Sequence, residues 1–292
     1  MAARIAAMLV ATGALLAAAV ATAQERVILE RRSPYNTVTV TEDERGLRAL
    51  WFSDGLARQS VIDPRDPDHL EAKYAQAVPF ALALAARNER MLVVGLGGGV
   101  IPSFLHRRVP SMAIDAVELD PGVVDVARSH FGFRDDALLR AHVGDGRRFV
   151  EDARTRYDIV LLDAFGTDSV PYALATREFL ESVRRAVAPG GVVVGNVWSR
   201  SRNPLYDAML ATYRAVFDEV WILELDGAVN RLVVAGTAKG AFAREQATRR
   251  AREVASRLQL RTDLGAMVER GFRPAGADGE GARVLVDADA PR

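Results

Sequence analysis

The sequence contains no cysteine, and this absence narrows the chemistry that is open to the chain. Disulfide bonds, thiolate nucleophiles and cysteine-ligated metal sites are all excluded. Histidine is scarce as well, and the spacing of the four residues matches no metal-ligand motif: His69, His106, His130 and His142. We therefore expect no metal site.

An excess of charge of either sign is also missing, because 38 Lys and Arg balance 38 Asp and Glu. Proteins that bind the phosphate backbone of nucleic acids usually carry a marked basic excess. The balance therefore argues against nucleic acid as a partner. Hydrophobic residues make up 49% of the 292 residues, which is enough for one large core with a small accessory domain.

The first 23 residues differ in composition from the rest of the chain. Arg4 provides a positive start, residues 5–21 form a run rich in Ala, Leu and Val, and Ala21-Thr-Ala23 resembles a cleavage site. This pattern predicts a signal peptide over residues 1–23 and export to the periplasm or the medium. The alternative is a membrane anchor through residues 5–21, although this run is short for a full span.

Residues 24–66 predict a small antiparallel β-domain. Between Arg26 and Asp63, apolar and polar residues alternate in short segments, and turns at Ser33-Pro34 and at residues 43–46 break the alternation. Helical periodicity follows from Leu70 to Ala86 and leads into the next domain.

Residues 67–240 predict an α/β domain with a mostly parallel sheet, because strand-length apolar runs alternate with amphipathic segments. The expected strands are Met91–Leu96, Met112–Leu119, Leu139–Val143, Tyr157–Leu162, Gly191–Val197, Val220–Leu225 and Arg231–Ala235. Only five residues separate the last two, which is too short for a crossover helix. These two runs therefore predict an antiparallel hairpin at the sheet edge, which is typical of the class I methyltransferase-type (Rossmann-like) fold.

Residues 241–292 predict a C-terminal helix and a tail. Phe242–Leu258 is rich in arginine and reads as a solvated surface helix, with a partner or anionic-membrane site as the alternative. From Arg273 onward the chain holds few large apolar residues, so we expect the tail to be poorly ordered.

A glycine cluster stands where the first predicted strand of the sheet meets a helix. Gly95, Gly97, Gly98 and Gly99 allow a ligand to approach the backbone and free N–H groups at the helix N-terminus. A tight turn without a ligand would need the same residues, so the cluster alone decides little.

Acidic residues at the following strand ends support the ligand interpretation. Glu118 ends the second strand about twenty residues after the glycines, where a carboxylate accepts ribose hydroxyls. Asp145 and Asp163 follow the third and fourth strands, although Asp145 is also a suitable helix N-cap. Because parallel strands open onto one crevice, these groups predict a site for an adenosine moiety.

Four motifs resemble, in order and spacing, the polyamine aminopropyltransferases (spermidine synthase family). They are Val94-Gly-Leu-Gly-Gly-Gly99, Val117-Glu-Leu-Asp-Pro121, Val143-Gly-Asp-Gly146-Arg-Arg-Phe149 and Tyr157-Asp-Ile-Val-Leu-Leu-Asp163. The similarity runs from about Ser33 to about Ala235, with weaker matches at Ser33-Pro-Tyr-Asn36 and Asp54-Gly55.

This resemblance implies a cofactor-binding set in addition to the glycines. Glu118 would hold the ribose with Leu119 beside it, and Asp145 would contact the adenine amino group next to Gly146. The co-substrate implied is decarboxylated S-adenosylmethionine, or S-adenosylmethionine itself, without a metal.

The resemblance also implies a small-molecule amine as substrate and a homodimer. Asp163 would be the catalytic residue that orients a polyamine amine and takes its proton. Gln59, Tyr74 and Asp168 would bind the substrate.

Three positions depart from the family pattern. Val100 replaces the Asp that contacts the terminal amine of the cofactor, Ala75 replaces a polar residue beside Tyr74, and Asp168 lies in an altered loop. Two alternatives to aminopropyl transfer therefore stay open. Val100 favours a methyltransferase that uses intact S-adenosylmethionine, and the leader favours a non-catalytic exported module that binds a nucleoside or a polyamine.

Overall fold

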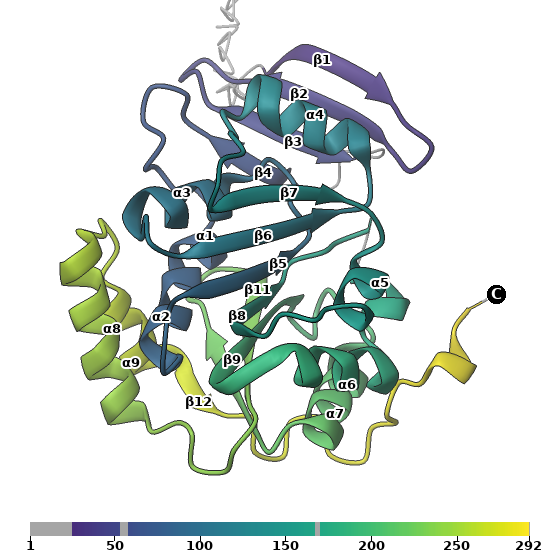
Figure 1. Ribbon diagram of the computed structural model, residues 1–292, viewed down its shortest axis with the longest axis vertical. Coiled ribbons are helices and arrows are strands. Elements are labelled where there is room, and N and C mark those ends of the chain that lie inside the picture. Colours follow the sequence, from purple (N-terminus) through teal and green to yellow (C-terminus); the bar gives the residue numbers. More distant parts are fainter. Residues whose placement is uncertain (1–24, 53–57, 167–169, 292) are drawn as a thin grey trace, which may run out of the picture.

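The computed structural model describes residues 25–52, 58–166 and 170–291 (Figure 1). The predicted leader, the Asp54-Gly55 match and Asp168 lie outside these ranges. Within them, no helix combines the length and the apolar character that crossing a bilayer requires.

The N-terminal part forms the small antiparallel sheet that the sequence predicts. Its strands pair in chain order: β1 (Arg26–Arg32), β2 (Thr37–Glu42), β3 (Arg48–Phe52) and β4 (Arg58–Ile62). Val38, Val40 and Leu50 point to one face and are fully buried in a core shared with the main domain. The small sheet is therefore attached to the main domain by a continuous apolar contact.

The main sheet has eight strands in the order β12-β10-β11-β9-β8-β5-β6-β7. They are β5 (Arg90–Val94), β6 (Ala113–Glu118), β7 (Leu139–Val143), β8 (Tyr157–Leu162), β9 (Val187–Trp198), β10 (Glu219–Glu224), β11 (Asn230–Gly236) and β12 (Phe272–Pro274). The strands β5 to β9 are parallel, whereas β10 and β11 form an antiparallel hairpin that joins β9. The predicted fold class is confirmed.

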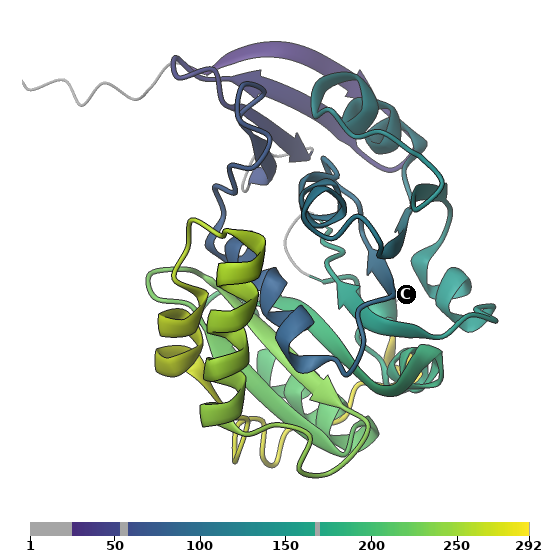
Figure 2. The same ribbon diagram turned by 60° about the vertical axis from the view of Figure 1, so that its left-hand side comes forward.

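Helices cover both faces of this sheet (Figures 1 and 2). They are α1 (Lys73–Ala77), η1 (Val78–Phe80), α2 (Ala81–Leu84), α3 (Val100–Arg108), α4 (Pro121–His130), α5 (Gly146–Glu151), η2 (Tyr172–Leu174), α6 (Arg177–Ala186), α7 (Tyr206–Val216), α8 (Arg244–Leu258), α9 (Leu264–Gly271) and η3 (Asp287–Asp289). Along β5, Met91 and Val93 enter one core and Leu92 and Val94 the other. The sheet is thus buried on both faces, as a parallel sheet requires.

The C-terminal region differs from its prediction. Helix α8 is solvated on one face only, because Ala251 and Val254 are buried in the core beside α9, as Figure 2 shows. The tail packs as well: Leu285 is fully buried, and β12 pairs with the outer side of β10. The expectation of a poorly ordered tail was wrong, because a few well-placed apolar residues and backbone hydrogen bonds hold it.

Candidate active site

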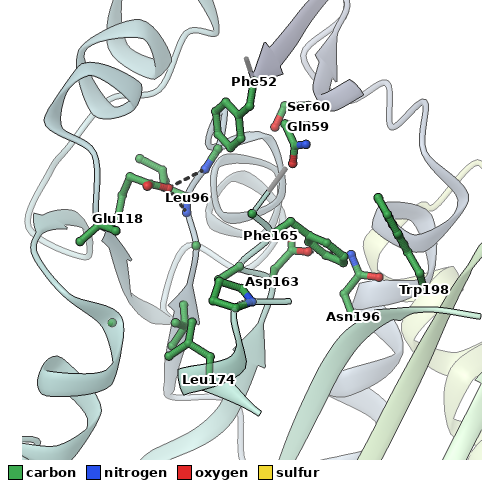
Figure 3. Close-up of a pocket in the computed structure, with 18 of the residues that line it drawn as sticks. Phe52, Gln59, Ser60, Leu96, Glu118, Asp163, Phe165, Leu174, Asn196 and Trp198 are labelled. Atoms are coloured by element: carbon green, nitrogen blue, oxygen red, sulfur yellow. Dashed lines mark hydrogen bonds between the residues drawn. The ribbon is translucent and has the colours of Figure 1, made fainter. Parts of the chain in front are cut away.

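A cavity of about 750 Å³ opens at the carboxyl ends of β5, β6, β8 and β9. This is where parallel α/β sheets bind ligands. Most of the predicted site residues in the described part of the chain line it: Gln59, Tyr74, Gly95, Gly97, Glu118, Leu119, Asp145, Gly146 and Asp163. In the view of Figure 3, Glu118 lies at one end, Asn196 and Trp198 at the other, and Asp163 between them.

Two of the four glycines shape the cavity directly. At Gly95 the backbone has φ +98°, and a Cβ there would lie 2.4 Å from the carbonyl oxygen of Asp163. At Gly97 φ is +54°, and a Cβ would lie 2.8 Å from Ser60 Oγ. Both positions therefore require glycine for conformation and for space.

The other two glycines serve packing behind the turn. A Cβ at Gly98 would lie 2.7 Å from the ring of Phe131, and one at Gly99 would lie 2.5 Å from the ring of Phe133. Neither glycine lines the cavity. Their cofactor contact, which the sequence predicts, stays a prediction, and the structure supports the tight-turn interpretation for them.

Glu118 holds the glycine turn from the neighbouring strand. Its Oε2 accepts hydrogen bonds from the backbone N–H groups of Leu96 at 3.0 Å and Gly97 at 3.3 Å, and its Oε1 accepts one from Asp120 at 3.2 Å. Burial raises the pKa of the Glu118 carboxyl, and these donors oppose the rise. The carboxylate thus faces the cavity in a fixed orientation, with lone pairs left for a ligand hydroxyl.

Asp145 has the two roles that the sequence left open. It is the N-cap of α5, where its Oδ1 accepts hydrogen bonds from the N–H groups of Arg147 and Arg148. Its side chain also lines the cavity, and these two bonds use only one of its oxygens. The two roles are compatible, because Oδ2 takes no part in the cap.

Asp163 lies at the centre of the cavity, at the end of β8. Asn196 Nδ2 donates a hydrogen bond of 2.7 Å to Asp163 Oδ1, and Asn230 Nδ2 donates one of 2.8 Å to Asn196 Oδ1. Burial raises the pKa of Asp163 to about 7, against the lowering effect of the Asn196 hydrogen bond. A carboxyl with this pKa exchanges protons near neutral pH, which suits an acid–base role.

Tyr74 and two aromatic residues shape the cavity around Asp163. Burial and the charge of Asp163 raise the pKa of Tyr74 well above its ordinary value, so the phenol stays protonated. Phe165 and Trp198 lie with ring centroids 5.6 Å apart and line the same cavity. These apolar faces restrict water around the carboxylate.

The chain pattern did not identify Asn196, Phe165 or Trp198 as site residues. One signal in the sequence could have identified Asn196, which is a polar residue near the end of a long apolar run in β9. The structure shows that Asn196 is buried. A buried amide needs hydrogen-bond partners, and at a carboxyl end of a parallel strand those partners lie in the crevice.

A smaller chamber of about 230 Å³ continues from the main cavity past Asp163. It shares Tyr74 and Asp163 with the main cavity, and both Val100 and Ala75 line it. Two of the three departures from the motif pattern therefore meet in one place, beside polar residues such as Gln59 and Glu71.

The C-terminal tail contacts the end of the cavity that Asp145 and α5 line. Asp287 accepts two hydrogen bonds from the guanidinium of Arg147, at 2.7 and 2.6 Å. Arg147 lines the cavity and also donates to the carbonyl of Ala173 in η2 at 3.2 Å. The tail thus fixes the start of α5 and η2, two walls of the cavity.

No group of three or more His, Asp or Glu side chains suited to a metal ion occurs in the described ranges.

Comparisons of sequence identify relatives of the chain. The profile of the Spermine/spermidine synthase domain matches residues 75–213. Polyamine aminopropyltransferase of Vibrio vulnificus is 35% identical over 205 residues, which cover 68% of this chain and 67% of the relative. The eEF1A lysine and N-terminal methyltransferase of Homo sapiens is 32% identical over 187 residues, 58% of this chain and 27% of the relative. The chain thus spans about a quarter of that methyltransferase.

Comparisons of structure agree on the fold. A probable spermidine synthase from Corynebacterium glutamicum has a TM-score of 0.72 at 21% identity, over 89% of this chain and 96% of that one. Human methyltransferase-like protein 13 in complex with SAH has a TM-score of 0.59 at 30% identity, over 64% and 93%.

The fold and these relatives define the chain as a transferase of the methyltransferase-type α/β class. Within that class, it belongs to the spermine/spermidine synthase family.

Proposed function

We propose that the chain transfers an alkyl group from the sulfonium of an S-adenosyl nucleoside to the nitrogen of an amine. The first candidate for this reaction is transfer of an aminopropyl group from decarboxylated S-adenosylmethionine to a polyamine. The observation that carries this proposal is Asp163, a buried carboxyl with a pKa of about 7, at the junction of the two chambers.

The nucleoside would occupy the Glu118 side of the cavity. Glu118 would use its remaining lone pairs for the two ribose hydroxyls, and the Asp145 oxygen that the cap leaves unused would accept from an adenine amino group. Leu119 and Leu174 provide apolar contact for the base. The volume of about 750 Å³ is in the range of small-molecule and cofactor sites.

The chemistry follows from the position of Asp163. An ammonium has no lone pair, so the acceptor must lose a proton before its nitrogen attacks the carbon beside sulfur. The new C–N bond forms as the C–S bond breaks, and the electron pair goes to sulfur, which leaves as a neutral thioether. Asp163 orients the amine and takes its proton, while Asn196 fixes the carboxylate.

Methyl transfer from intact S-adenosylmethionine is the second candidate. Val100 favours it, because this position, which lines the inner chamber, lacks the Asp that the motif pattern places there for the amine of the decarboxylated compound. The 30% identity to the human methyltransferase structure, solved with SAH, also supports it.

Calorimetry on protein lacking residues 1–23 tests both forms. We expect decarboxylated S-adenosylmethionine to bind more tightly than the intact compound, and release of the thioether nucleoside when putrescine or spermidine is added. Tighter binding of the intact compound without aminopropyl transfer would favour methyl transfer. Failure to bind either compound would remove the whole proposal.

Val100→Asp should improve the fit of an aminopropyl donor. Val100 is 9% exposed and lines the inner chamber, so a carboxylate there gives a terminal ammonium a charged partner. We expect decarboxylated S-adenosylmethionine to bind about tenfold more tightly, which corresponds to one charge-assisted hydrogen bond. Val100→Thr, with similar volume and no charge, is the control and should leave the affinity unchanged. Equal affinities for both variants would show that the chamber does not hold this ammonium.

Asp287→Asn should weaken nucleoside binding, because it removes the ion pair that holds Arg147 at the nucleoside end of the cavity. The Asp287–Arg147 pair is bidentate but partly exposed, so its loss is worth roughly 1 kcal/mol or less. We expect about three- to fivefold weaker nucleoside binding by calorimetry. Asp289→Asn in the same short helix is the matched control. A reduction of the same size in both variants would point to a general effect of charge.

We further propose that the chain is exported through residues 1–23. Fractionation of cells that express the full chain, with mass spectrometry of its N-terminus, tests this proposal. Cleavage after Ala23 is the expected result, and an intact N-terminus in the membrane fraction would indicate an anchor through residues 5–21 instead.

A further inference from the structure

Residues of β3, β4, α3 and the end of α4 line a second surface cavity of about 300 Å³. Figure 1 labels these four elements. Four arginines line it, and no described Asp or Glu does: Arg48, Arg107, Arg128 and Arg134. His130 lines it too, but burial and the charge of Arg48 lower the pKa of its imidazole. Since acidic and basic residues balance over the whole chain, this cavity is a local concentration of positive charge.

The carboxylates that pair with these arginines lie outside the lining. Arg48 pairs with Glu42 at 3.0 Å, Arg107 with Asp68 at 3.1 Å and Arg128 with Asp135 at 2.8 Å. Two of the three acids are shared, because Glu42 also pairs with Arg26 and Asp68 with Arg108. The pairs therefore orient the guanidinium groups without neutralising the cavity.

Arg134 adds a charge without a carboxylate partner in the described ranges. Its Nη1 donates to the backbone carbonyls of Arg128 and Phe133. These bonds hold the guanidinium at the cavity and leave its other N–H groups for a ligand.

Ser103 provides a second observation that points to a ligand. It lies on the α3 side of the cavity, is 9% exposed, and its Oγ has no hydrogen-bond partner among the described residues. A buried hydroxyl without a partner is costly, so a ligand acceptor beside it would recover a hydrogen bond.

We propose that this cavity binds a small phosphate-bearing molecule. Guanidinium groups match the geometry of phosphate oxygens, and several converge here. Ile62, Pro64 and Pro67 form an apolar wall beside the charges, and the volume exceeds that of one phosphate group. The site therefore fits an organic phosphate better than the free ion. It shares Val100 with the inner chamber, but Asp163 does not line it, and the proposal does not depend on the proposed group transfer.

Calorimetry at low salt tests the site with phenyl phosphate, inorganic phosphate and pyrophosphate, each titrated into wild-type protein. We expect one-to-one binding, tightest for phenyl phosphate. Arg134→Gln, which breaks no carboxylate pair, should weaken binding at least fivefold. Arg252→Gln on the exposed side of α8 removes the same charge elsewhere and should change affinity less than twofold.

The opposite results would overturn the proposal. Absence of saturable binding for every phosphate would show that the arginines serve only the surrounding ion pairs. Equal weakening by Arg134→Gln and Arg252→Gln would show non-specific attraction of anions. Tighter binding of inorganic phosphate than phenyl phosphate would exclude an organic ligand. Melting temperatures within a few degrees of the wild type establish that the variants fold.

Discussion

Asp163→Asn should lower kcat at least a hundredfold and leave nucleoside affinity within about threefold. The amide is isosteric and keeps an oxygen that accepts from Asn196 Nδ2, so the cavity should retain its shape. The amide cannot take a proton, and general-base catalysis typically contributes a factor of 10² to 10⁴. Steady-state kinetics and calorimetry on the same preparation check the two parts.

The pH dependence gives an independent test of Asp163. Its pKa of about 7 means that the carboxylate form, which takes the proton, prevails only above neutral pH. We therefore expect kcat/KM to rise through about pH 7 and then to level off. The rising limb should disappear in Asp163→Asn but persist in Asp152→Asn, an exposed control at the C-terminus of α5. A profile unchanged by Asp163→Asn would assign the proton transfer to another group.

The same substitution should stabilise the fold at high pH. Between about pH 4 and 7 the unfolded chain ionises Asp163 while the folded chain keeps it protonated, so stability falls as pH rises. Above pH 7 the wild type bears the full penalty, about 4 kcal/mol for a shift of about three pKa units. Asp163→Asn removes it. Melting temperatures of the variant and wild type should therefore diverge from pH 4 to pH 8 and coincide near pH 4.

Local chain patterns were sufficient to predict seven of the eight strands of the main sheet and most of the predicted residues that line the cavity. The strands β5 and β8 are runs of apolar residues with chemistry-bearing residues directly after them, at Gly95 and Asp163. Because parallel strands end on one edge, the position of each motif in the sequence fixed its position in the crevice.

Contacts between distant segments could not be predicted in this way. Asn196 approaches Asp163 only because β9 pairs with β8, and Asp287 reaches Arg147 across 140 residues of sequence. The tail has few large apolar residues, yet Leu285 is fully buried. The composition of the tail does not predict this burial. Such burial depends on the tertiary surface that a segment meets.

The glycine cluster shows how one motif combines two physical roles. Gly95 and Gly97 shape the cavity, whereas Gly98 and Gly99 leave room for the rings of Phe131 and Phe133. In the sequence, all four glycines look equivalent. The two roles could be told apart only from the positions of the two rings, which belong to the segment directly after α4.

Glu118→Gln should weaken nucleoside binding about a hundredfold. The carboxylate accepts three backbone N–H groups and, in the proposed complex, the ribose hydroxyls. Glutamine replaces one acceptor oxygen with an NH₂ group, which then faces N–H donors or ribose hydroxyls without a suitable lone pair. Hydrogen bonds to charged groups are worth roughly 1.5–3 kcal/mol each, and loss of about 3 kcal/mol gives this change.

Stability should respond much less than affinity, because burial already raises the pKa of Glu118 and the neutral amide avoids that desolvation cost. We expect the melting temperature of Glu118→Gln without ligand to lie within a few degrees of the wild type. Calorimetry with the thioether nucleoside measures the affinity, and Glu245→Gln on the exposed face of α8 is the matched control. If Glu118→Gln bound the nucleoside as tightly as this control, Glu118 would serve only to hold the turn at Leu96 and Gly97, and the ribose would have to lie elsewhere in the cavity.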